Sequence, residues 1–387
     1  MQNKKTILFI SHEASLTGAP ILLLNLINCL KNDFNILIVL KRGGDIENLF
    51  LNTATTYILK HKNYSSEKNI FKKVIDRVVY FFKQLSIIIP YYKADIIFSN
   101  TVCNGRLLKR FNFFMKPIVT YVHELESMLQ YFNQWNDTKY SLELSSKILF
   151  PSNAVQENLI QQHQIQKSRT VYLPYYFPHQ NFDFDFKDKP QHRKVFLQQW
   201  SIPEDSFLVV GMGMVSERKG TNHFIEVAKQ VIEKSTKIYF IWIGDFSDEL
   251  STQIIKKDFY NKSDSPNILF TGKLPYSTQN LLPFDLFFLS SVEDPYPLVV
   301  LEAAYQYVPS ICYENSGGIT EFVSKEFGFN IANNNVEETA KTIVEISHNK
   351  PHLTDLSLKV RNRVLNLHSN KSHTIHLFNK VIENLLK

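Results

Sequence analysis

Short apolar runs, often β-branched, alternate with longer amphipathic stretches along nearly the whole chain. Strands that are buried on both faces appear as such continuous runs, and connections of this length suit helices. The pattern predicts parallel sheets with helices on both faces, an α/β fold of the doubly wound kind. The predicted strands are Thr6–Ser11, Asn35–Leu40, Thr55–Leu59, Asp95–Asn100, Pro117–Glu124, Lys147–Pro151, Thr170–Tyr176, Ser206–Gly213, Lys237–Gly244, Asn267–Thr271, Leu286–Ser290, Ser310–Tyr313 and Gly328–Ile331.

The length of the chain and a pause in this alternation predict two domains. A chain of 387 residues suits two domains of about 150–200 residues each. The alternation stops between His179 and Asp205, so we expect a first domain over residues 1–178 and a connection over 179–205. A second domain then covers 206–367, and a final helix lies within 368–387. Ligands bind such folds outside the carboxyl ends of the strands, so we expect a cleft between the two sheets.

Cysteine usage and hydropathy favour a cytoplasmic protein. The three cysteines, Cys29, Cys103 and Cys312, are far apart and show no metal-ligand spacing, which favours reduced thiols. The apolar run Thr6–Ile10 is shorter than the roughly 7–15 residues of a signal-peptide core. No window reaches the roughly 18 apolar residues of a spanning helix.

Positive charge is concentrated in the first half of the chain. Residues 1–170 hold 21 Lys and Arg against 12 Asp and Glu, a net +9, whereas the remainder carries −3. This indicates an anionic partner, but no zinc-finger, helix-turn-helix or RNA-binding aromatic motif points to nucleic acid. The segment Lys68–Lys83 is apolar, aromatic and cationic together, which suits an anionic membrane surface. An ordinary crossover helix within Lys68–Ile89 is the favoured interpretation.

The most informative stretch runs from Ser290 to Ala304. A strand ends at Ser290, an acidic loop follows, and Pro297 is placed to begin a helix that is apolar all round. Glu302 lies within that helix. A buried carboxylate is costly unless it meets strong donors, and sugar or ribose hydroxyls are such donors. A Glu on a solvated stripe, or one stabilised near the helix start, is an equally good interpretation of the residues alone.

Three further stretches suit an anionic or polar ligand. Arg218 and Lys219 follow the glycines that end a strand, a corner that suits a diphosphate, although such a pair is usually a solvated surface. The dinucleotide fingerprint is not met, because Ser216 occupies the place of its third glycine. Gly18 opens the first helix, as in many strand–helix turns. His123 ends a strand over the predicted cleft, where a structural histidine is otherwise commoner.

The stretch Ser290–Ala304 resembles the acidic–seven residues–Glu motif of retaining glycosyltransferases of family 4. The resemblance implies the GT-B fold, in which two doubly wound, Rossmann-like domains face each other across a cleft. It also implies that Asp294 faces the transferred sugar and that Glu302 binds the ribose of the nucleotide. Asp294 stands where many relatives have Glu, which keeps the charge and shortens its reach.

The other stretches appear in the order in which the family has them. The resemblance implies that Lys219 neutralises the leaving diphosphate, with Arg218 replacing a cation that many relatives carry at the position of Met214. It implies that His123 touches the donor sugar and that Gly18 belongs to the family's glycine-rich loop. The same comparison assigns further donor-binding positions to Gly213, Lys273, Leu274, Leu298 and Val299.

The resemblance implies retaining transfer of a sugar from a nucleoside diphosphate sugar to a hydroxyl acceptor, without a cofactor or metal. The expected acceptor is a glycan or lipid-linked glycan in bacterial cell-surface polysaccharide or glycolipid synthesis, with peripheral contact at the inner face of the plasma membrane. The sequence Asp183–Asp185 imitates a metal-binding pair, but it lies in the predicted connection. The alternatives are a nucleotide-sugar epimerase on the same fold, or an inactive scaffold, which Met214 and Asp294 alone favour.

Overall fold

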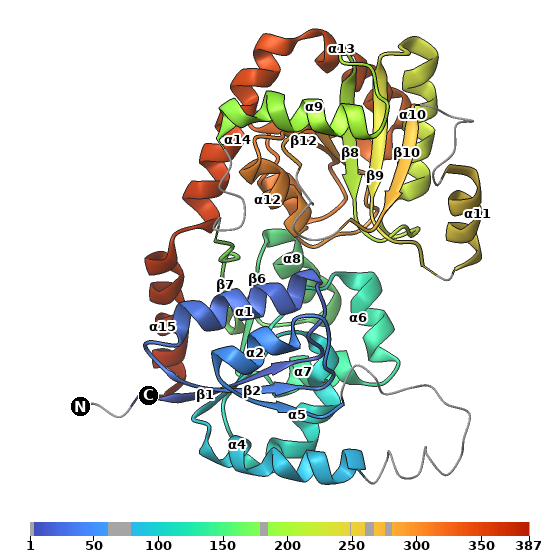
Figure 1. The fold of residues 1–387 in the computed structure, drawn as a ribbon. Coiled ribbons are helices and arrows are strands. Elements are labelled where there is room, and N and C mark those ends of the chain that lie inside the picture. Colours follow the sequence, from blue (N-terminus) through green and yellow to red (C-terminus); the bar gives the residue numbers. More distant parts are fainter. Residues whose placement is uncertain are drawn as a thin grey trace. The chain divides into compact units, whose positions relative to one another are not determined.

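The computed structural model describes residues 4–60, 79–178, 185–247, 249–259, 267–274 and 281–386. The chain divides into two compact units, one formed by Met1–Phe177 with Asn370–Lys387 and the other by Pro178–Ser369 (Figure 1). Each unit is an α/β layer structure around a parallel sheet, as the alternation of apolar runs predicts. The predicted fold class is therefore confirmed.

The sheet of the first unit has the strand order β3-β2-β1-β4-β5-β6-β7, and every pairing is parallel. Its strands are β1 (Thr6–Ser11), β2 (Asn35–Leu40), β3 (Thr55–Ile58), β4 (Ile96–Ser99), β5 (Ile118–Tyr121), β6 (Lys147–Phe150) and β7 (Thr170–Tyr172). Its helices are α1 (Gly18–Leu30), α2 (Glu47–Thr53), α4 (Ile88–Lys93), α5 (Gly105–Phe111), α6 (Glu126–Asn133), α7 (Asp137–Leu144), α8 (Asn153–His163) and α15 (Lys371–Leu386).

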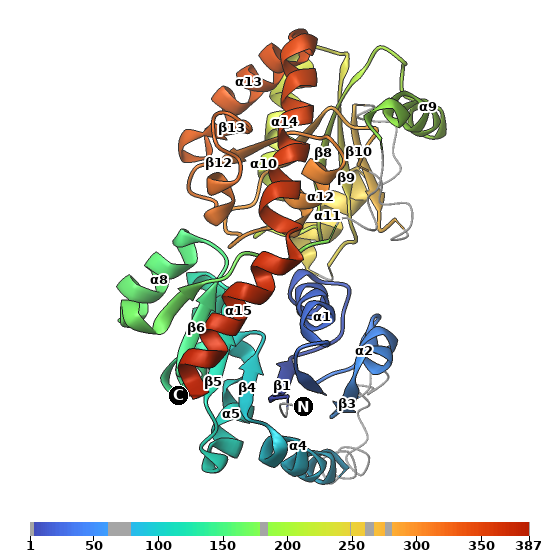
Figure 2. The same ribbon diagram turned by 90° about the vertical axis from the view of Figure 1, so that its left-hand side faces the viewer.

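The C-terminal helix α15 completes the core of the first unit. Phe378 is fully buried, and its ring lies 6.0 Å from that of Phe34 and 5.8 Å from that of Phe98. The helix lies beside α1, where the Cys29 thiol donates to the carbonyl oxygen of Lys371 at 3.7 Å (Figure 2). A segment more than 190 residues away from the rest of the unit along the chain therefore covers its sheet.

The sheet of the second unit has the order β10-β9-β8-β11-β12-β13 and is also parallel throughout. Its strands are β8 (Phe207–Met212), β9 (Ile238–Ile243), β10 (Ile268–Gly272), β11 (Leu286–Leu289), β12 (Ser310–Tyr313) and β13 (Gly328–Ile331). Its helices are α9 (Lys189–Gln199), α10 (Thr221–Lys234), α11 (Leu250–Phe259), α12 (Leu298–Tyr305), α13 (Val336–His348) and α14 (Lys350–His368). Aromatic rings fill the core, with Phe224 5.1 Å from Trp242 and 5.8 Å from Phe288.

Strand order reverses once in each sheet, at the pair β1/β4 in the first unit and at β8/β11 in the second. In open parallel sheets, the crevice outside the carboxyl ends of such a pair is where ligands bind. The loops that follow these four strands are therefore the places to look for function.

Several predicted boundaries differ from the structure. The strands that begin at Pro117 and Thr170 stop at Tyr121 and Tyr172, so His123 lies in a loop rather than on a strand. Helix α12 begins at Leu298 with Pro297 at its N-cap, one residue later than predicted.

The stretch predicted as a connection, residues 179–205, groups with the second unit and supplies α9. Pro190 stands in the first turn of that helix, where its missing N–H costs nothing. The Arg193 guanidinium holds α9 on the unit by donating to Asp285 and to the carbonyl oxygen of Pro283, both at 2.8 Å. The sequence predicts a short helix here, around Arg193–Trp200, and α9 begins four residues earlier and ends one residue earlier.

The predicted membrane-contacting segment lies largely outside the described residues. Residues 79–86 are helical and α4 follows them, whereas 68–78 are not described. The three cysteines are free thiols and all are buried. Among the helices that the structure describes, none combines the length and the apolar character that crossing a membrane requires.

Candidate active site

Two loops are joined at the carboxyl edge of the second sheet, one after β8 and one after β11. The Val292 N–H donates to the carbonyl oxygen of Arg218 at 3.1 Å, and the Ser290 hydroxyl donates to that of Lys219 at 3.1 Å. These bonds link segments about 70 residues apart in sequence. The cationic pair and the acidic loop of the sequence analysis are therefore parts of one structure.

Gly220 is the reason that the two loops approach so closely. Its φ is +65°, a left-handed conformation that favours glycine, and it stands at the N-cap of α10. A Cβ at this position would lie 1.7 Å from the carbonyl oxygen of Ser290. Any other residue would force the loops apart.

The joined loops bring Lys219 and Asp294 into an ion pair. The Lys219 Nζ lies 2.5 Å from the Asp294 Oδ2, and the two side chains are only 17% and 9% exposed. The Asp294 N–H also donates to the carbonyl oxygen of Ser316 at 2.7 Å, so both ends of this residue are held. A pair this sheltered from water is costly to break by removing one partner, because the remaining charge then lacks a counter-ion.

Arg218 and Gly213 border this pair. The Arg218 side chain is exposed and its Nη1 donates to the carbonyl oxygen of Glu293 at 3.2 Å. Gly213 follows β8 with a φ of +141°, and its carbonyl oxygen accepts from the Trp242 indole at 2.9 Å. A Cβ at Gly213 would lie 3.4 Å from the Lys219 Cε, an ordinary contact, so the backbone φ rather than lack of space favours glycine here.

Glu302 lies in the second turn of α12, which follows the acidic loop directly. Leu298 is buried and Val299 is half-buried at the start of this helix. Glu302 itself is half-buried, and desolvation raises the pKa of its carboxyl to about 7. Among the described residues no hydrogen-bond donor or cation is recorded for this carboxylate. This disfavours the solvated-stripe interpretation and leaves a carboxylate able to accept from a ligand.

Lys273 and Leu274 follow β10, which is two strands away from β8 in the sheet. Lys273 is exposed and Leu274 is half-buried. Gly272, the last residue of β10, has a φ of +70°. These two positions therefore lie farther along the carboxyl edge than the Lys219–Asp294 pair, and residues 275–280 are outside the described part of the chain.

In the first unit, His123 and the Gly18 loop meet through Asn100, which follows β4. The Asn100 Nδ2 donates to the carbonyl oxygen of Ala19 at 2.8 Å, so its Oδ1 faces the His123 Nε2 at 3.2 Å. Since Oδ1 only accepts, His123 carries its proton on Nε2, and its Nδ1 accepts from the Tyr175 hydroxyl at 2.9 Å. Burial, and to a smaller extent His12, lowers the pKa of His123 to about 3.

His123 is thus a neutral imidazole with a protein partner at each ring nitrogen, which is the structural role that the residues alone favoured. A sugar hydroxyl can therefore bind His123 only if it replaces one of these two partners or shares a ring nitrogen with it. Asn100 was within reach of sequence reasoning, because it ends the predicted strand Asp95–Asn100. That strand is β4, which pairs with β5, the strand that leads to His123. Tyr175 lies in the predicted strand Thr170–Tyr176, but β7 ends at Tyr172, and nothing in the sequence indicates its contact with His123.

Glu124 is a second residue whose importance sequence reasoning missed. It is 7% exposed, and its Oε2 accepts from the backbone N–H of His123 at 2.8 Å. Burial raises the pKa of Glu124 to about 8, and backbone donors only partly offset this effect.

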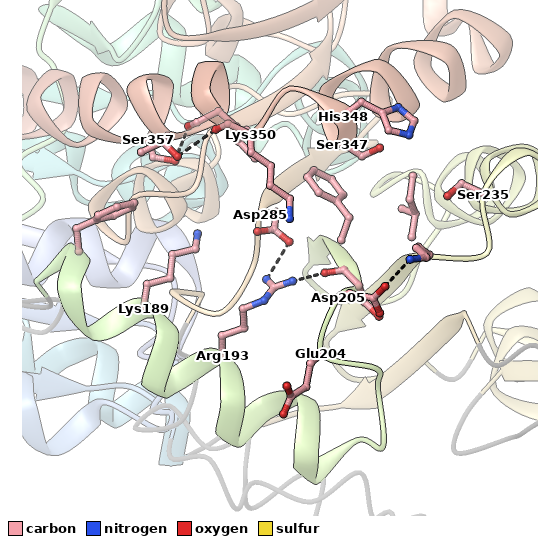
Figure 3. A pocket seen from close by; sticks show the side chains of 17 residues that line it. Lys189, Arg193, Glu204, Asp205, Ser235, Asp285, Ser347, His348, Lys350 and Ser357 are labelled. Atoms are coloured by element: carbon pink, nitrogen blue, oxygen red, sulfur yellow. Dashed lines mark hydrogen bonds and ion pairs between the residues drawn. The ribbon is translucent and has the colours of Figure 1, made fainter.

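A cavity of about 470 Å³ in the second unit lies at the opposite edge of the sheet, where α9 faces the first residues of β8 and β9 (Figure 3). Two ion pairs cross its lining, Arg193–Asp285 at 2.8 Å and Lys237–Asp205 at 2.5 Å, and the Lys189 Nζ donates to the carbonyl oxygen of Phe284 at 2.6 Å. Ligands of parallel sheets bind at the carboxyl edge. This cavity is therefore better explained as space left where α9 packs against the sheet.

No cluster of three or more His, Cys, Asp or Glu side chains that could hold a metal occurs among the residues that the structure describes. Of the sequence Asp183–Asp185, only Asp185 is described. Its carboxylate accepts from the Lys187 N–H at 3.1 Å and begins a short turn before α9.

Residues 192–363, which cover nearly all of the second unit, match the model of the family described as glycosyl transferases group 1. The second unit belongs to this family. Lys219, Asp294 and Glu302 all lie within the matched region. The resemblance to glycosyltransferases is therefore confirmed for this part of the chain.

Curated relatives are similar over part of their length. The chain is 29% identical to the alpha-galactosylglucosyldiacylglycerol synthase of Streptococcus pneumoniae over 206 residues, 51% of each chain. It is 28% identical to the processive diacylglycerol alpha-glucosyltransferase of Acholeplasma laidlawii over 156 residues, 40% of this chain and 44% of that one. The chain thus spans about half the length of the curated relatives that it matches.

Solved structures are similar over almost the whole chain. The Anabaena protein HepE in complex with UDP and glucose has a TM-score of 0.77 and 17% identity, covering 99% of both chains. A glycosyltransferase from Rickettsia africae has a TM-score of 0.72 and 18% identity, covering 100% of this chain and 99% of that one. At these identities the likeness shows the fold alone, and that fold is GT-B.

Proposed function

We propose that the protein is a retaining glycosyltransferase that moves a sugar from a nucleoside diphosphate sugar to a hydroxyl acceptor. The observation that carries this proposal is the Lys219–Asp294 pair, held by joined loops at the β8/β11 reversal of a group 1 glycosyl transferase domain. A fixed cation in a sheltered site stabilises charge that develops on a leaving group more strongly than water does.

In this proposal a diphosphate competes with Asp294 for Lys219. Two phosphoryl groups carry more negative charge than one carboxylate, so binding the donor draws the Lys219 ammonium away and releases Asp294 to accept from sugar hydroxyls. Arg218, which is exposed and bonded only to a carbonyl among the described residues, supplies the second cation. Glu302 accepts from the ribose hydroxyls. Gly213, Leu298 and Val299 shape the surroundings of the diphosphate.

The same proposal assigns the remaining candidates to the sugar and the base. His123 orients the sugar from the first unit, with Gly18 near the donor phosphate. Lys273 and Leu274 hold the base farther along the edge of the second sheet. Because cations and backbone donors supply the charge stabilisation, the reaction proceeds without a metal or other cofactor.

Two of the comparisons support the type of donor and the stereochemistry. HepE has been solved with UDP-glucose, and the names of both curated relatives specify alpha products. In the common UDP-hexoses the sugar is α-linked, so an α-product retains configuration. We propose that the acceptor attacks on the face from which the diphosphate departs, and that the diphosphate takes the proton of the acceptor hydroxyl.

We propose a lipid-linked acceptor in cell-surface glycolipid or polysaccharide synthesis, reached at an anionic membrane surface. The names of the curated relatives specify diacylglycerol glycosides. In the first unit, Phe81, Phe82, Ile89 and Tyr92 are 55–70% exposed on residues 79–86 and α4. Apolar side chains beside a net +9 suit the inner face of a plasma membrane.

The proposal is tested by measuring sugar transfer from donor to acceptor. The protein is incubated with UDP-glucose or UDP-galactose and a panel of glucosyl lipids that includes glucosyldiacylglycerol and a dodecyl glucosyl phosphodiester, and the linkage of the product is read from its anomeric proton coupling. We expect an α-linked product, and we expect Lys219→Ala to lower turnover by about a hundredfold or more. Lys229→Ala, an exposed residue of α10, serves as the matched control.

The alternatives give different results in the same experiment. A β-linked product contradicts retention. Conversion of the donor sugar without any acceptor indicates an epimerase. Donor binding without turnover across a broad acceptor panel indicates an inactive scaffold.

A further inference from the structure

The first unit has a cavity of about 520 Å³ that none of the candidate residues lines. His12 and Glu13 follow β1, Lys41 and Arg42 follow β2, and Lys60 follows β3. The cavity therefore opens at the carboxyl edge of the sheet, where parallel sheets bind their ligands. The loop after β4 closes it on the other side of β1, through residues 103 and 106.

Positive charge dominates the walls of this cavity. The cations Lys41, Arg42, Lys60 and Arg106 face two carboxylates, so the lining carries a net +2 when His12 is neutral. One carboxylate, Asp137, is already engaged, since its two oxygens accept from the backbone N–H of Arg106 at 2.7 Å and from its Nε at 2.9 Å.

Glu13, the second carboxylate, is held by its own loop. Its Oε1 accepts from the Ser15 hydroxyl at 2.6 Å and lies 3.6 Å from the His12 Nε2. The neighbouring His12 is the main cause that lowers the pKa of Glu13 to about 2, so the carboxylate stays ionised. Both carboxylates of the lining, Asp137 and Glu13, are thus bonded to neighbours other than Lys41.

Lys41 is the most deeply placed of the cations. Its Nζ donates to the carbonyl oxygen of Cys103, and no carboxylate lies within ion-pair distance of it among the described residues. Burial lowers the pKa of Lys41, which is the behaviour of a cation without an adequate counter-ion. An anionic ligand would provide one. Near the mouth of the cavity, Arg42 is exposed, and Lys60 lies 4.8 Å above the Tyr80 ring.

Aromatic side chains form the wall contributed by α6 and the turn after it. The rings of Tyr131 and Trp135 lie 5.2 Å apart and nearly perpendicular, and these side chains are 48% and 42% exposed although they line the cavity. Large aromatic side chains are normally well buried, and an exposed pair suits the apolar face of a sugar ring.

We infer that this cavity binds the acceptor, and that the acceptor is a sugar carrying a phosphoryl group. The phosphoryl group lies against Lys41 and Arg42, and the sugar ring packs on Tyr131 and Trp135. This inference rests on the proposed function, because only a transferase needs a second sugar site. A phosphoryl group fits better than a carboxylate, since its charge approaches −2 and its three oxygens can accept from several cations at once.

Calorimetric titration of the full chain tests the site without requiring turnover. The probes are α-glucose 1-phosphate, glucose and inorganic phosphate. We expect glucose 1-phosphate to bind at least tenfold more tightly than either of the others. Arg42→Gln and Trp135→Ala should each weaken it at least tenfold. Arg110→Gln and Tyr172→Ala, exposed residues of the same unit outside the cavity, should change it less than twofold.

Equal affinity for glucose and glucose 1-phosphate, or unchanged binding by Arg42→Gln, would overturn the inference. A second arm replaces glucose 1-phosphate by a dodecyl glucosyl phosphodiester in phosphatidylcholine vesicles. Tighter binding of this probe, still lost in Arg42→Gln, assigns the phosphoryl group to a lipid-linked acceptor. Weaker binding assigns it to a free sugar phosphate.

A parallel titration with UDP separates this inference from the proposed function. Arg42→Gln should leave the affinity for UDP unchanged, and an equal loss for both ligands would overturn a separate acceptor site. If the protein binds glucose 1-phosphate at Arg42 but transfers no sugar from any donor, the proposed function fails while the phosphosugar site stands.

Discussion

Glu302 changes its charge near neutral pH, because burial raises the pKa of its carboxyl to about 7. The ionised form accepts hydrogen bonds from ribose hydroxyls more strongly than the protonated form does. We therefore expect the affinity for UDP to rise about tenfold between pH 6 and pH 8, as the ionised fraction of such a group does. In Glu302→Gln the affinity should be lower and nearly independent of pH. Calorimetric titration at the two pH values measures this.

Glu226→Gln, on the exposed face of α10, is the control, because the phosphate of UDP also titrates in this range. A pH dependence that persists in Glu302→Gln would remove this residue from the donor site. The stability of the protein checks independently that the pKa of Glu302 is raised on folding. Between pH 4.5 and about 7 the unfolded carboxyl ionises while the buried one stays protonated, so the free energy of unfolding declines as pH rises through this window. The decline should be smaller in Glu302→Gln.

At the scale of an element, the joint between the loops after β8 and β11 depends on Gly220. Alanine there brings a Cβ to 1.7 Å from the carbonyl oxygen of Ser290 and strains a backbone with a φ of +65°. We expect Gly220→Ala to lower the free energy of unfolding by about 1–3 kcal/mol and to weaken UDP binding at least tenfold. Urea unfolding and calorimetry measure the two effects. Asn222→Ala, exposed in the same helix, should change neither, and normal UDP affinity in Gly220→Ala would show that the joint does not shape the donor site.

Elements were predictable from sequence wherever burial and hydrogen bonding coincide. β1, β2, β12 and β13 have the predicted bounds, and polar residues occur at or just after the end of each strand. β5 was predicted too long, since Val122 is fully buried and its N–H still donates to the carbonyl oxygen of Leu149 at 2.9 Å although the strand ends at Tyr121.

The candidate site was only partly predictable for a related reason. The stretches that hold Lys219 and Asp294 were visible, but their 2.5 Å contact joins positions 75 residues apart and could be anticipated only through the family resemblance. The partners of His123 follow two separate strands, β4 and β7, and of the two only Asn100 was within reach of sequence reasoning. The predicted cleft between the domains stays a prediction.

At the scale of the whole molecule, the concentration of charge in residues 1–170 predicts binding to anionic vesicles. In flotation assays we expect the protein to rise with vesicles that contain phosphatidylglycerol and not with phosphatidylcholine alone. Binding should fall as salt increases from 0.1 M to 1 M, because the screening length shortens from about 10 Å to about 3 Å. Phe81→Ser with Phe82→Ser should weaken it, whereas Tyr172→Ser should not. Equal flotation on neutral vesicles would contradict an electrostatic contact.

The central claim is that the second unit binds a nucleoside diphosphate through Lys219. Calorimetric titration of UDP into the full chain tests it most directly. We predict one site per chain, at least tenfold weaker binding in Lys219→Ala, and unchanged binding in the control Lys229→Ala. If UDP and the other nucleoside diphosphates fail to bind, or if Lys219→Ala binds them as the unaltered protein does, the account of the donor site is wrong.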